Sequence, residues 1–222
     1  MSARKVRDRL LRRARNAGLD LPPVLAAGLE AYYLELARWN AKVNLTAFSL
    51  DGDGNDQAID RLLIEPVLAV RHLSPRATSL LDAGSGGGSP AIPMKLARPD
   101  LNLHMVEVKV RKSVFLRQVA RTLSLSETFV LNTRFEELLT RADLHEAMSA
   151  ISIRAVRVDT KLMTTLQAFL QPGGQLLSFV STSTKQIAPV PPMVEVGAYD
   201  LLPENRSRLL VLQKSSIGIR ST

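Results

Sequence analysis

A glycine-rich turn interrupts the middle of the chain, in the segment SLLDAGSGGGSPAIPMKLARPD at residues 79–100. An apolar run that predicts a strand ends at Asp82, and glycine then recurs at alternate positions, namely Gly84, Gly86 and Gly88. Glycine lets the backbone turn sharply and approach a ligand closely. The helix expected next has Ser89 as its N-cap and Pro90 at its first position. In an open α/β sheet, ligands bind at this end of a strand.

Two acidic residues favour one ligand for this turn. The dinucleotide-binding fingerprint requires a third glycine at position 89, where the chain has Ser89. Instead, Asp82 lies two positions before the first glycine, as in motif I of S-adenosylmethionine methyltransferases. Glu107 ends the next predicted strand, where it could accept hydrogen bonds from both ribose hydroxyls of this cofactor. The alternative is a purely structural turn, with Glu107 an ordinary solvated residue at the end of a strand.

The chain around this turn alternates short apolar runs with longer helical patterns, which is typical of βαβ units in a mostly parallel sheet. We expect strands at residues 78–82, 101–107, 128–131, 149–153 and 175–180, and helices at residues 90–97, 111–123, 134–141 and 159–170. Pro172, Gly173 and Gly174 should end the last helix. Two further runs, 193–202 and 208–213, predict a terminal antiparallel hairpin. We therefore predict a doubly wound, seven-stranded, Rossmann-like α/β domain of the class I S-adenosylmethionine methyltransferase type.

An N-terminal helical extension precedes this domain. Apolar residues at helical spacing predict an amphipathic helix over residues 24–43, and glycine and aspartate predict a loop over residues 51–60. We expect an N-terminal segment at residues 1–56 and the methyltransferase domain at residues 57–222.

The first fifteen residues carry seven arginine or lysine residues and one acidic residue, Asp8, in a chain of formal net charge +8. Such a basic arm is attracted to polyanions and can contact phosphates. The candidate RNA-binding residues are Arg4, Lys5, Arg7, Arg12 and Arg13. An anionic membrane surface is a weaker candidate partner, and the alternative is a solvated, partly helical tail.

Several classes of protein are excluded by composition. The chain has no cysteine, which excludes disulfides, thiolate zinc sites and cysteine nucleophiles. Its three histidines do not cluster in the sequence, so we expect no metal. No apolar run is long enough for a membrane span or a signal peptide. We expect a cytoplasmic monomer without a membrane partner.

The sequence resembles the ribosomal small-subunit methyltransferase G family, RsmG or GidB, over roughly residues 30–214. The resemblance is carried by WNAKVNLTAF at residues 39–48, by the glycine turn, by VRKSVFLRQVARTLSL at residues 110–125, by Arg134 with Glu136, by Arg154 with Ala155, and by LLVLQK at residues 209–214. The family is known to methylate N7 of a guanine in 16S ribosomal RNA. The resemblance thus implies S-adenosylmethionine as cofactor and 16S ribosomal RNA or the small ribosomal subunit as partner.

The resemblance also implies particular cofactor contacts. These come from the backbone around Gly84 and Ser89, from Phe135 and Glu136 near the adenine, and from Arg154 after the fourth strand. The chain departs from the family at several positions. The family usually has alanine where this chain has Phe135. It usually has a histidine followed by an aspartate-serine pair where this chain has Leu62, Glu65 and Pro66. A lysine-glycine pair is replaced by STSTK, and the basic C-terminal tail is missing after Lys214.

Guanine N7 carries an in-plane lone pair and no proton, so its methylation needs alignment of the reactants but no general base. The absence of cysteine excludes methylation at cytosine C5, which requires a thiolate. Arg154 could orient the base or stabilise the site electrostatically, or it could form a structural ion pair with Glu136 or Glu107. Trp39 could stack on a base, but core packing is favoured by its place in an amphipathic helix.

Other functions stay open at this point. The same fold could methylate another RNA, a protein or a small molecule, or it could be a non-catalytic nucleotide-binding module.

Overall fold

The computed structural model describes residues 3–50, 56–155, 159–183 and 188–216. Seven strands form one sheet in the order β3-β2-β1-β4-β5-β7-β6. Their bounds are β1 Ser79–Ala83, β2 Asn102–Val106, β3 Thr128–Leu131, β4 Met148–Arg154, β5 Leu170–Ser181, β6 Met193–Leu202 and β7 Ser207–Lys214. β1 to β5 run parallel, and β7 is antiparallel to both β5 and β6. The doubly wound sheet and the terminal hairpin are confirmed.

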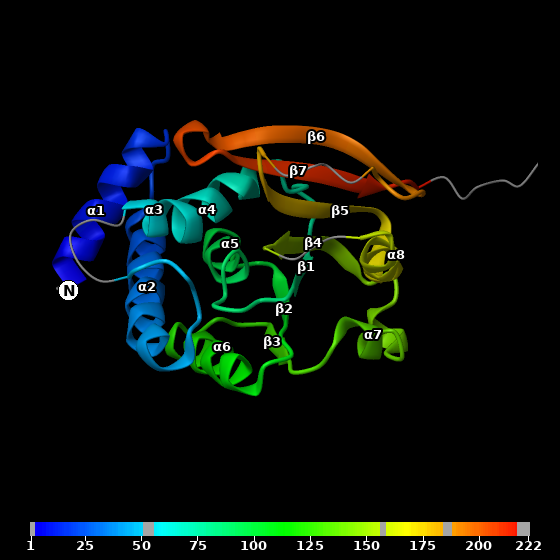
Figure 1. Cartoon of the computed structure of the whole chain (residues 1–222), viewed down its shortest axis with the longest axis horizontal. Coiled ribbons are helices and arrows are strands. Elements are labelled where there is room, and N and C mark those ends of the chain that lie inside the picture. Colours follow the sequence, from blue (N-terminus) through cyan, green and yellow to red (C-terminus); the bar gives the residue numbers. More distant parts are fainter. Residues whose placement is uncertain (1–2, 51–55, 156–158, 184–187, 217–222) are drawn as a thin grey trace, which may run out of the picture.

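Helices cover both faces of this sheet, so neighbouring residues of a strand enter different cores. In β1, Leu80 belongs to one apolar cluster and Leu81 to the other, and both are fully buried. Figure 1 shows α1 to α6 on one side of the sheet, and α7 (Phe135–Leu138) and α8 (Thr160–Phe169) on the other. Burial on both faces explains why the central parallel strands β1 and β4 are mostly apolar.

The N-terminal segment folds as two helices, α1 (Ala3–Asn16) and α2 (Pro23–Val43). Buried residues of α2, including Leu29, Tyr33 and Leu36, belong to the same apolar cluster as α5 (Ala91–Ala97) and α6 (Val110–Thr122). α2 packs on α5 and α6, which are the helices that follow β1 and β2 in the chain. The segment therefore shares a core with the sheet, and the predicted division at residue 56 stays a prediction.

A helical stretch from Asp56 to His72 was not predicted. It comprises α3 (Asp56–Ile59), the π-helical η1 (Asp60–Ile64), α4 (Glu65–Ala69) and the 3-10 helix η2 (Val70–His72). The loop expected over residues 51–60 is therefore wrong from Asp56 onward, while residues 51–55 lie outside the described part. Residues 62–69 are all buried, so no polar face gave the stretch a helical periodicity.

The sequence also misplaced the start of β5. Pro172, Gly173 and Gly174 were expected to end a helix, but α8 ends at Phe169 and these residues lie inside the strand. Met148 pairs with Leu170 and Ala150 pairs with Gln175, so β5 carries extra residues that bulge out of the ladder. Proline and glycine are tolerated in a strand at such a bulge.

The remaining elements are short. They are the 3-10 helices η3 (Ala142–Leu144) and η4 (Pro203–Asn205). α7 is shorter than the helix predicted over residues 134–141. No helix within the described ranges is both long and apolar enough to cross a bilayer.

Candidate active site

The glycine turn leaves open space above its centre. Gly86 and Gly88 have φ of +52° and +92°, conformations that L side chains rarely adopt. A Cβ atom at Gly86 would meet no atom closer than 3.8 Å, whereas one at Gly88 would lie 2.4 Å from Cδ1 of Ile92. Gly88 is therefore needed for packing against α5, and Gly86 faces a space that a ligand can enter.

Glu107 holds this turn from the end of β2. Its Oε2 accepts a hydrogen bond of 2.8 Å from the Gly86 amide, and its Oε1 one of 2.7 Å from the Lys109 amide. The residue is only 6% exposed, so the alternative of a solvated strand-end residue is wrong. A carboxylate has about four acceptor positions. Two therefore stay available to hydroxyl donors of a ligand above the turn.

Asp82 lies beneath the turn as a second buried carboxylate. It is 1% exposed, and its Oδ1 accepts a hydrogen bond of 2.5 Å from the Ser152 hydroxyl. Its Oδ2 is buried without a hydrogen-bond partner. Burial raises the pKa of Asp82 to about 6, against the opposing effect of the Ser152 hydroxyl. The site thus contains an acceptor that no described residue satisfies.

Arg154 forms a buried ion pair with a residue that the sequence analysis did not connect with it. Its Nη2 lies 3.1 Å from Oε2 of Glu65, and their side chains are 11% and 1% exposed. The guanidinium also lies 4.2 Å from the ring centroid of Phe179. Burial lowers the pKa of Arg154 to about 10, so it stays cationic at neutral pH. The predicted structural partners Glu136 and Glu107 are wrong, and the partner is Glu65, one of the departures from the family.

Arg154 and Ser89 join the helical stretch at residues 56–72 to the glycine turn. Nη1 of Arg154 donates to the Arg61 carbonyl and, at 3.3 Å, to Oγ of Ser89. The Ser89 hydroxyl in turn donates to the Leu62 carbonyl at 2.9 Å. Ser89 was predicted to be the N-cap of α5, which is wrong because Pro90 occupies that position without a side-chain cap.

Helix α2 holds the turn from the opposite side. The buried Tyr32 hydroxyl donates a hydrogen bond of 2.7 Å to the Gly87 carbonyl. A Cβ atom at Gly87 would lie 3.2 Å from both Leu36 Cδ1 and the Leu45 carbonyl, so α2 and the segment after it pack directly on the turn. Sequence reasoning missed Tyr32, since an aromatic residue on the apolar face of a helix indicates only core packing.

Phe135 and Glu136, expected near the adenine, begin α7. Phe135 is partly buried against the second apolar cluster, and the side chain of Glu136 is exposed. Within the described ranges, neither residue contacts Arg154. Their cofactor contacts stay a prediction.

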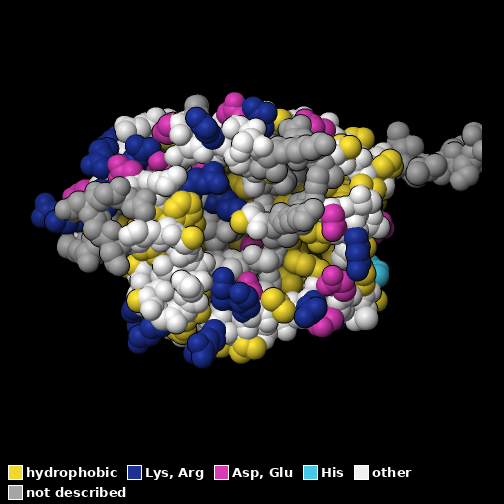
Figure 2. Space-filling model, in the orientation of Figure 1, with side chains coloured by type: hydrophobic (Ala, Val, Ile, Leu, Met, Phe, Trp, Pro, Cys, Tyr) yellow, Lys and Arg dark blue, Asp and Glu magenta, His cyan; other side chains and the backbone are white. Residues whose placement is uncertain are grey.

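The basic arm is the folded helix α1. Val6, Leu10 and Ala14 are buried, so the alternative of a solvated tail is wrong. Most of its arginines face acidic residues: Arg7 pairs with Glu30, Arg9 and Arg12 with Asp56, and Arg13 with Asp60 and Glu204. Arg4 and Lys5 are exposed. In Figure 2, the blue side chains over α1 are accordingly mixed with magenta ones.

A comparison with models of protein families gives the relationship. The model described as rRNA small subunit methyltransferase G, GidB, matches residues 26–188. The chain belongs to this family. The Ribosomal RNA small subunit methyltransferase G of Desulfotalea psychrophila is 33% identical over 168 residues, or 74% of each chain. Its counterpart from Ralstonia nicotianae is 41% identical over 116 residues, or 51% of this chain and 52% of its own.

A solved structure supports the fold of this GidB family member. A SAM dependent methyltransferase from Aquifex aeolicus gives a TM-score of 0.54 at 12% identity, over 70% of this chain and 92% of its own. Together with the strand order, this confirms the predicted Rossmann-like methyltransferase fold.

The WNAKVNLTAF segment, which carried much of the GidB resemblance, has a structural role here. The Asn40 side chain accepts hydrogen bonds from the Leu45 and Thr46 amides, at 2.7 and 2.9 Å, and fixes the chain where α2 ends. The Trp39 ring lies 5.7 Å from that of Phe115 and packs on the apolar cluster. Core packing of Trp39 is thus supported over stacking on a base.

Proposed function

We propose that this protein transfers a methyl group from S-adenosylmethionine to N7 of a guanine in the 16S ribosomal RNA of the small subunit. The observation that carries the proposal is the pairing of Glu107 with the Gly86 amide, which places a carboxylate with two further acceptor positions beside the uncrowded Gly86. Membership of the rRNA small subunit methyltransferase G family supports the acceptor.

The residues present fit the cofactor. The uncrowded face of the turn at Gly86 can take a ligand against the backbone, and Glu107 has free acceptor positions for the two ribose hydroxyls. Phe135 and Glu136 would lie near the adenine, as the family resemblance implies. The unsatisfied Oδ2 of Asp82 offers a negative potential beneath a ligand that carries a positive sulfonium.

The reaction needs little from the protein beyond alignment. When bound, S-adenosylmethionine supplies an electrophilic methyl group. The N7–carbon bond forms as the sulfur–carbon bond breaks, the positive charge passes from sulfur to the purine, and no proton moves. Holding the reacting atoms in line can contribute about 7 kcal/mol or more. The transfer therefore requires no catalytic base.

We propose that Arg154 acts as a positioning residue. Its guanidinium binds Glu65, the Arg61 carbonyl and Ser89, so it fixes the helical stretch against the turn. Its low exposure favours this role over direct contact with the target base. Replacement by lysine keeps the charge but loses the planar donor fork, so cofactor affinity should fall. An Arg154→Lys variant with unchanged cofactor affinity and turnover would contradict the proposal.

The proposal is tested by cofactor binding and labelled methyl transfer on the same variants. Glu107→Gln should weaken S-adenosylhomocysteine by about 10-fold or more, because a hydrogen bond to a charged group contributes about 1.5–3 kcal/mol. Glu127→Gln, at an exposed position, is the matched control and should bind normally. Wild-type protein should label 16S ribosomal RNA. Stabilisation by NAD but not by S-adenosylhomocysteine would contradict the proposal.

A further inference from the structure

Helix α6 presents a basic face to solvent. Residues 108–126 include five lysines and arginines and no acidic residue. The exposed cations recur at helical spacing on one side, while Phe115, Leu116 and Val119 on the other side are buried. The α6 basic face consists of Lys109, Arg111, Arg117 and Arg121. In Figure 2, blue side chains lie along the molecular edge formed by α6.

The cations of this face have no ion-pair partner among the described residues. In the part of the chain that the structure describes, none of the four forms an ion pair, and the hydrogen bond from Arg117 goes to the Val130 carbonyl, at 3.2 Å. On α1, by contrast, acidic partners face Arg7, Arg9, Arg12 and Arg13. A polyanion therefore gains more from α6, where it displaces no acidic partner among the described residues.

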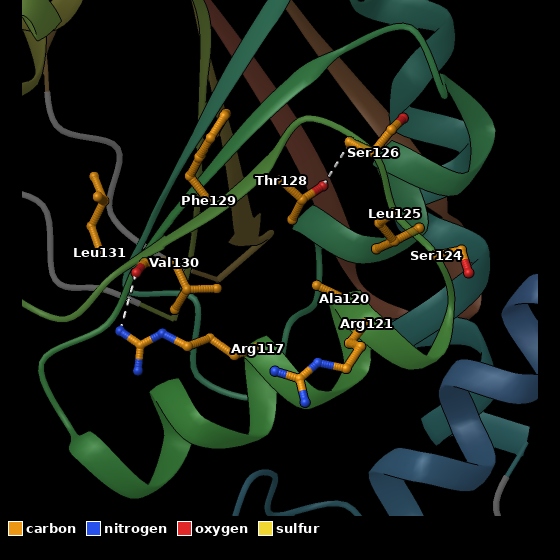
Figure 3. A pocket seen from close by; sticks show the side chains of 10 residues that line it. All are labelled: Arg117, Ala120, Arg121, Ser124, Leu125, Ser126, Thr128, Phe129, Val130 and Leu131. Carbon is orange, nitrogen blue, oxygen red and sulfur yellow. Dashed lines mark hydrogen bonds between the residues drawn. The ribbon is translucent and has the colours of Figure 1, made fainter.

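The α6 basic face is continuous with the site. Lys109, whose amide binds Glu107, precedes the first turn of α6, so one end of the face adjoins the glycine turn. The other end borders a hollow of about 600 Å³ between α6 and the edge strand β3. Figure 3 shows Arg117 and Arg121 extending from α6 beside β3, with Ser124, Ser126 and Thr128 near the end of the helix.

The chemistry of this surface fits a nucleic acid backbone. Arginine and lysine side chains and serine or threonine hydroxyls are among the groups that contact phosphate oxygens. Val110 and Val114, which are 64% and 45% exposed, lie among the cations and offer apolar contact for sugars or unstacked bases. Phe129 on β3 is 46% exposed and adds an aromatic surface at the same edge.

We propose that the α6 basic face binds the phosphate backbone of the substrate RNA and leads it from the edge of β3 to the glycine turn. The proposal rests on the proposed function, since it takes RNA as the substrate. It places the main phosphate contacts on α6, whereas the sequence alone placed them on α1.

The salt dependence of binding tests this. Binding of full-length protein to 16S ribosomal RNA is measured across a series of salt concentrations for wild type, Arg111→Gln/Arg121→Gln on α6, and Arg7→Gln/Arg12→Gln on α1. Both double variants lose the same charge at exposed or partly exposed helical positions. Each lost phosphate contact lowers the slope of log K against log salt by about 0.7 to 0.9, so the α6 variant should lose about 1.4 to 1.8. The α1 variant should keep the wild-type slope.

Other results overturn the proposal. The salt slope could fall as much in the α1 variant as in the α6 variant, or the α6 variant could keep the wild-type slope. Either result would show that α6 does not make the main phosphate contacts. The proposal is also overturned if the α6 variant binds RNA normally and loses only its binding to vesicles that contain anionic phosphatidylserine. S-adenosylhomocysteine affinity and methyl transfer are measured separately. If the wild type binds RNA through α6 but transfers no methyl group, the proposed function alone is contradicted. If the α6 variant methylates RNA as well as the wild type does, this inference alone is contradicted.

Discussion

Removing one partner of the ion pair between Glu65 and Arg154 should destabilise the protein strongly, because the other charge then stays buried. Glu65 is 1% exposed and accepts hydrogen bonds from Arg154 at 3.1 Å and from Arg61 at 3.2 Å. A Glu65→Gln substitution keeps the shape but leaves two cations beside a neutral amide. Removing one partner of a buried pair costs about 3–5 kcal/mol, because the other charge stays buried without compensation.

The lower end of this range applies here. The Arg61 carbonyl and the face of the Phe179 ring still solvate the Arg154 guanidinium in the variant. We therefore expect Glu65→Gln to lower the free energy of unfolding by about 3 kcal/mol. For a chain of this size that corresponds to a fall in Tm of about 6–12 °C. Urea and thermal unfolding, followed by circular dichroism, measure both quantities.

A matched control separates burial from charge. Asp200→Asn breaks the Arg208–Asp200 pair, in which the side chains are 35% and 52% exposed, and should cost less than about 1 kcal/mol. Replacing both Glu65 and Arg154 with methionine should recover most of the loss, since no unpaired charge then stays buried. A Glu65→Gln variant no less stable than Asp200→Asn would refute this account of the pair.

Three further predictions concern the residues around the turn. Burial raises the pKa of Asp82 to about 6, so the folded state favours the protonated carboxyl. The stabilisation from this proton is present below about pH 4 and is lost as pH rises to about 6. Relative to Asp82→Asn, the wild type should lose about 3 kcal/mol of unfolding free energy across this window, as urea titrations at each pH would show. Tyr32→Phe removes the donor to the Gly87 carbonyl and should cost about 1 kcal/mol and weaken S-adenosylhomocysteine, measured by calorimetry. Gly88→Ala should cost about 2 kcal/mol or more in thermal unfolding, because φ is positive there and the added Cβ atom would lie 2.4 Å from Cδ1 of Ile92.

Each of these has a result that contradicts it. Parallel pH profiles for wild type and Asp82→Asn would show that the Asp82 pKa is not raised. Tyr199→Phe, at an exposed position, is the control for Tyr32→Phe, and equal losses in the two would remove the special role of the Gly87 contact. Gly18 has φ of +67°, but a Cβ atom there would meet no atom within 4 Å. A Gly88→Ala variant as stable as Gly18→Ala would therefore exclude a steric cost at Gly88.

Local sequence patterns predicted much of the fold and part of the site. Short, mostly apolar runs located the strands, so the observed bounds of β1, β2, β3 and β4 lie close to the predicted ones. Glycine spacing and the carboxylates Asp82 and Glu107 located the turn, because these residues lie close together in the sequence or end neighbouring strands.

Contacts between distant residues could not be predicted in the same way. Glu65 and Arg154 are 89 residues apart, and nothing local to either residue indicates the other. The acidic partners of α1, which are Asp56, Asp60 and Glu204, lie far from it in the sequence. The stretch at residues 56–72 was missed for another reason: its central part, residues 62–69, is buried on all sides and lacks the polar face that makes a helix recognisable.

Mapping the methylated nucleotide tests the central claim most directly. Protein, S-adenosylmethionine with a labelled methyl group, and either small ribosomal subunits or naked 16S ribosomal RNA are incubated, and the RNA is then cleaved chemically at 7-methylguanosine. We predict label at a single guanine, with cleavage at that position alone. Label at another atom or base, or no label in RNA while S-adenosylhomocysteine still binds the protein, would contradict the account.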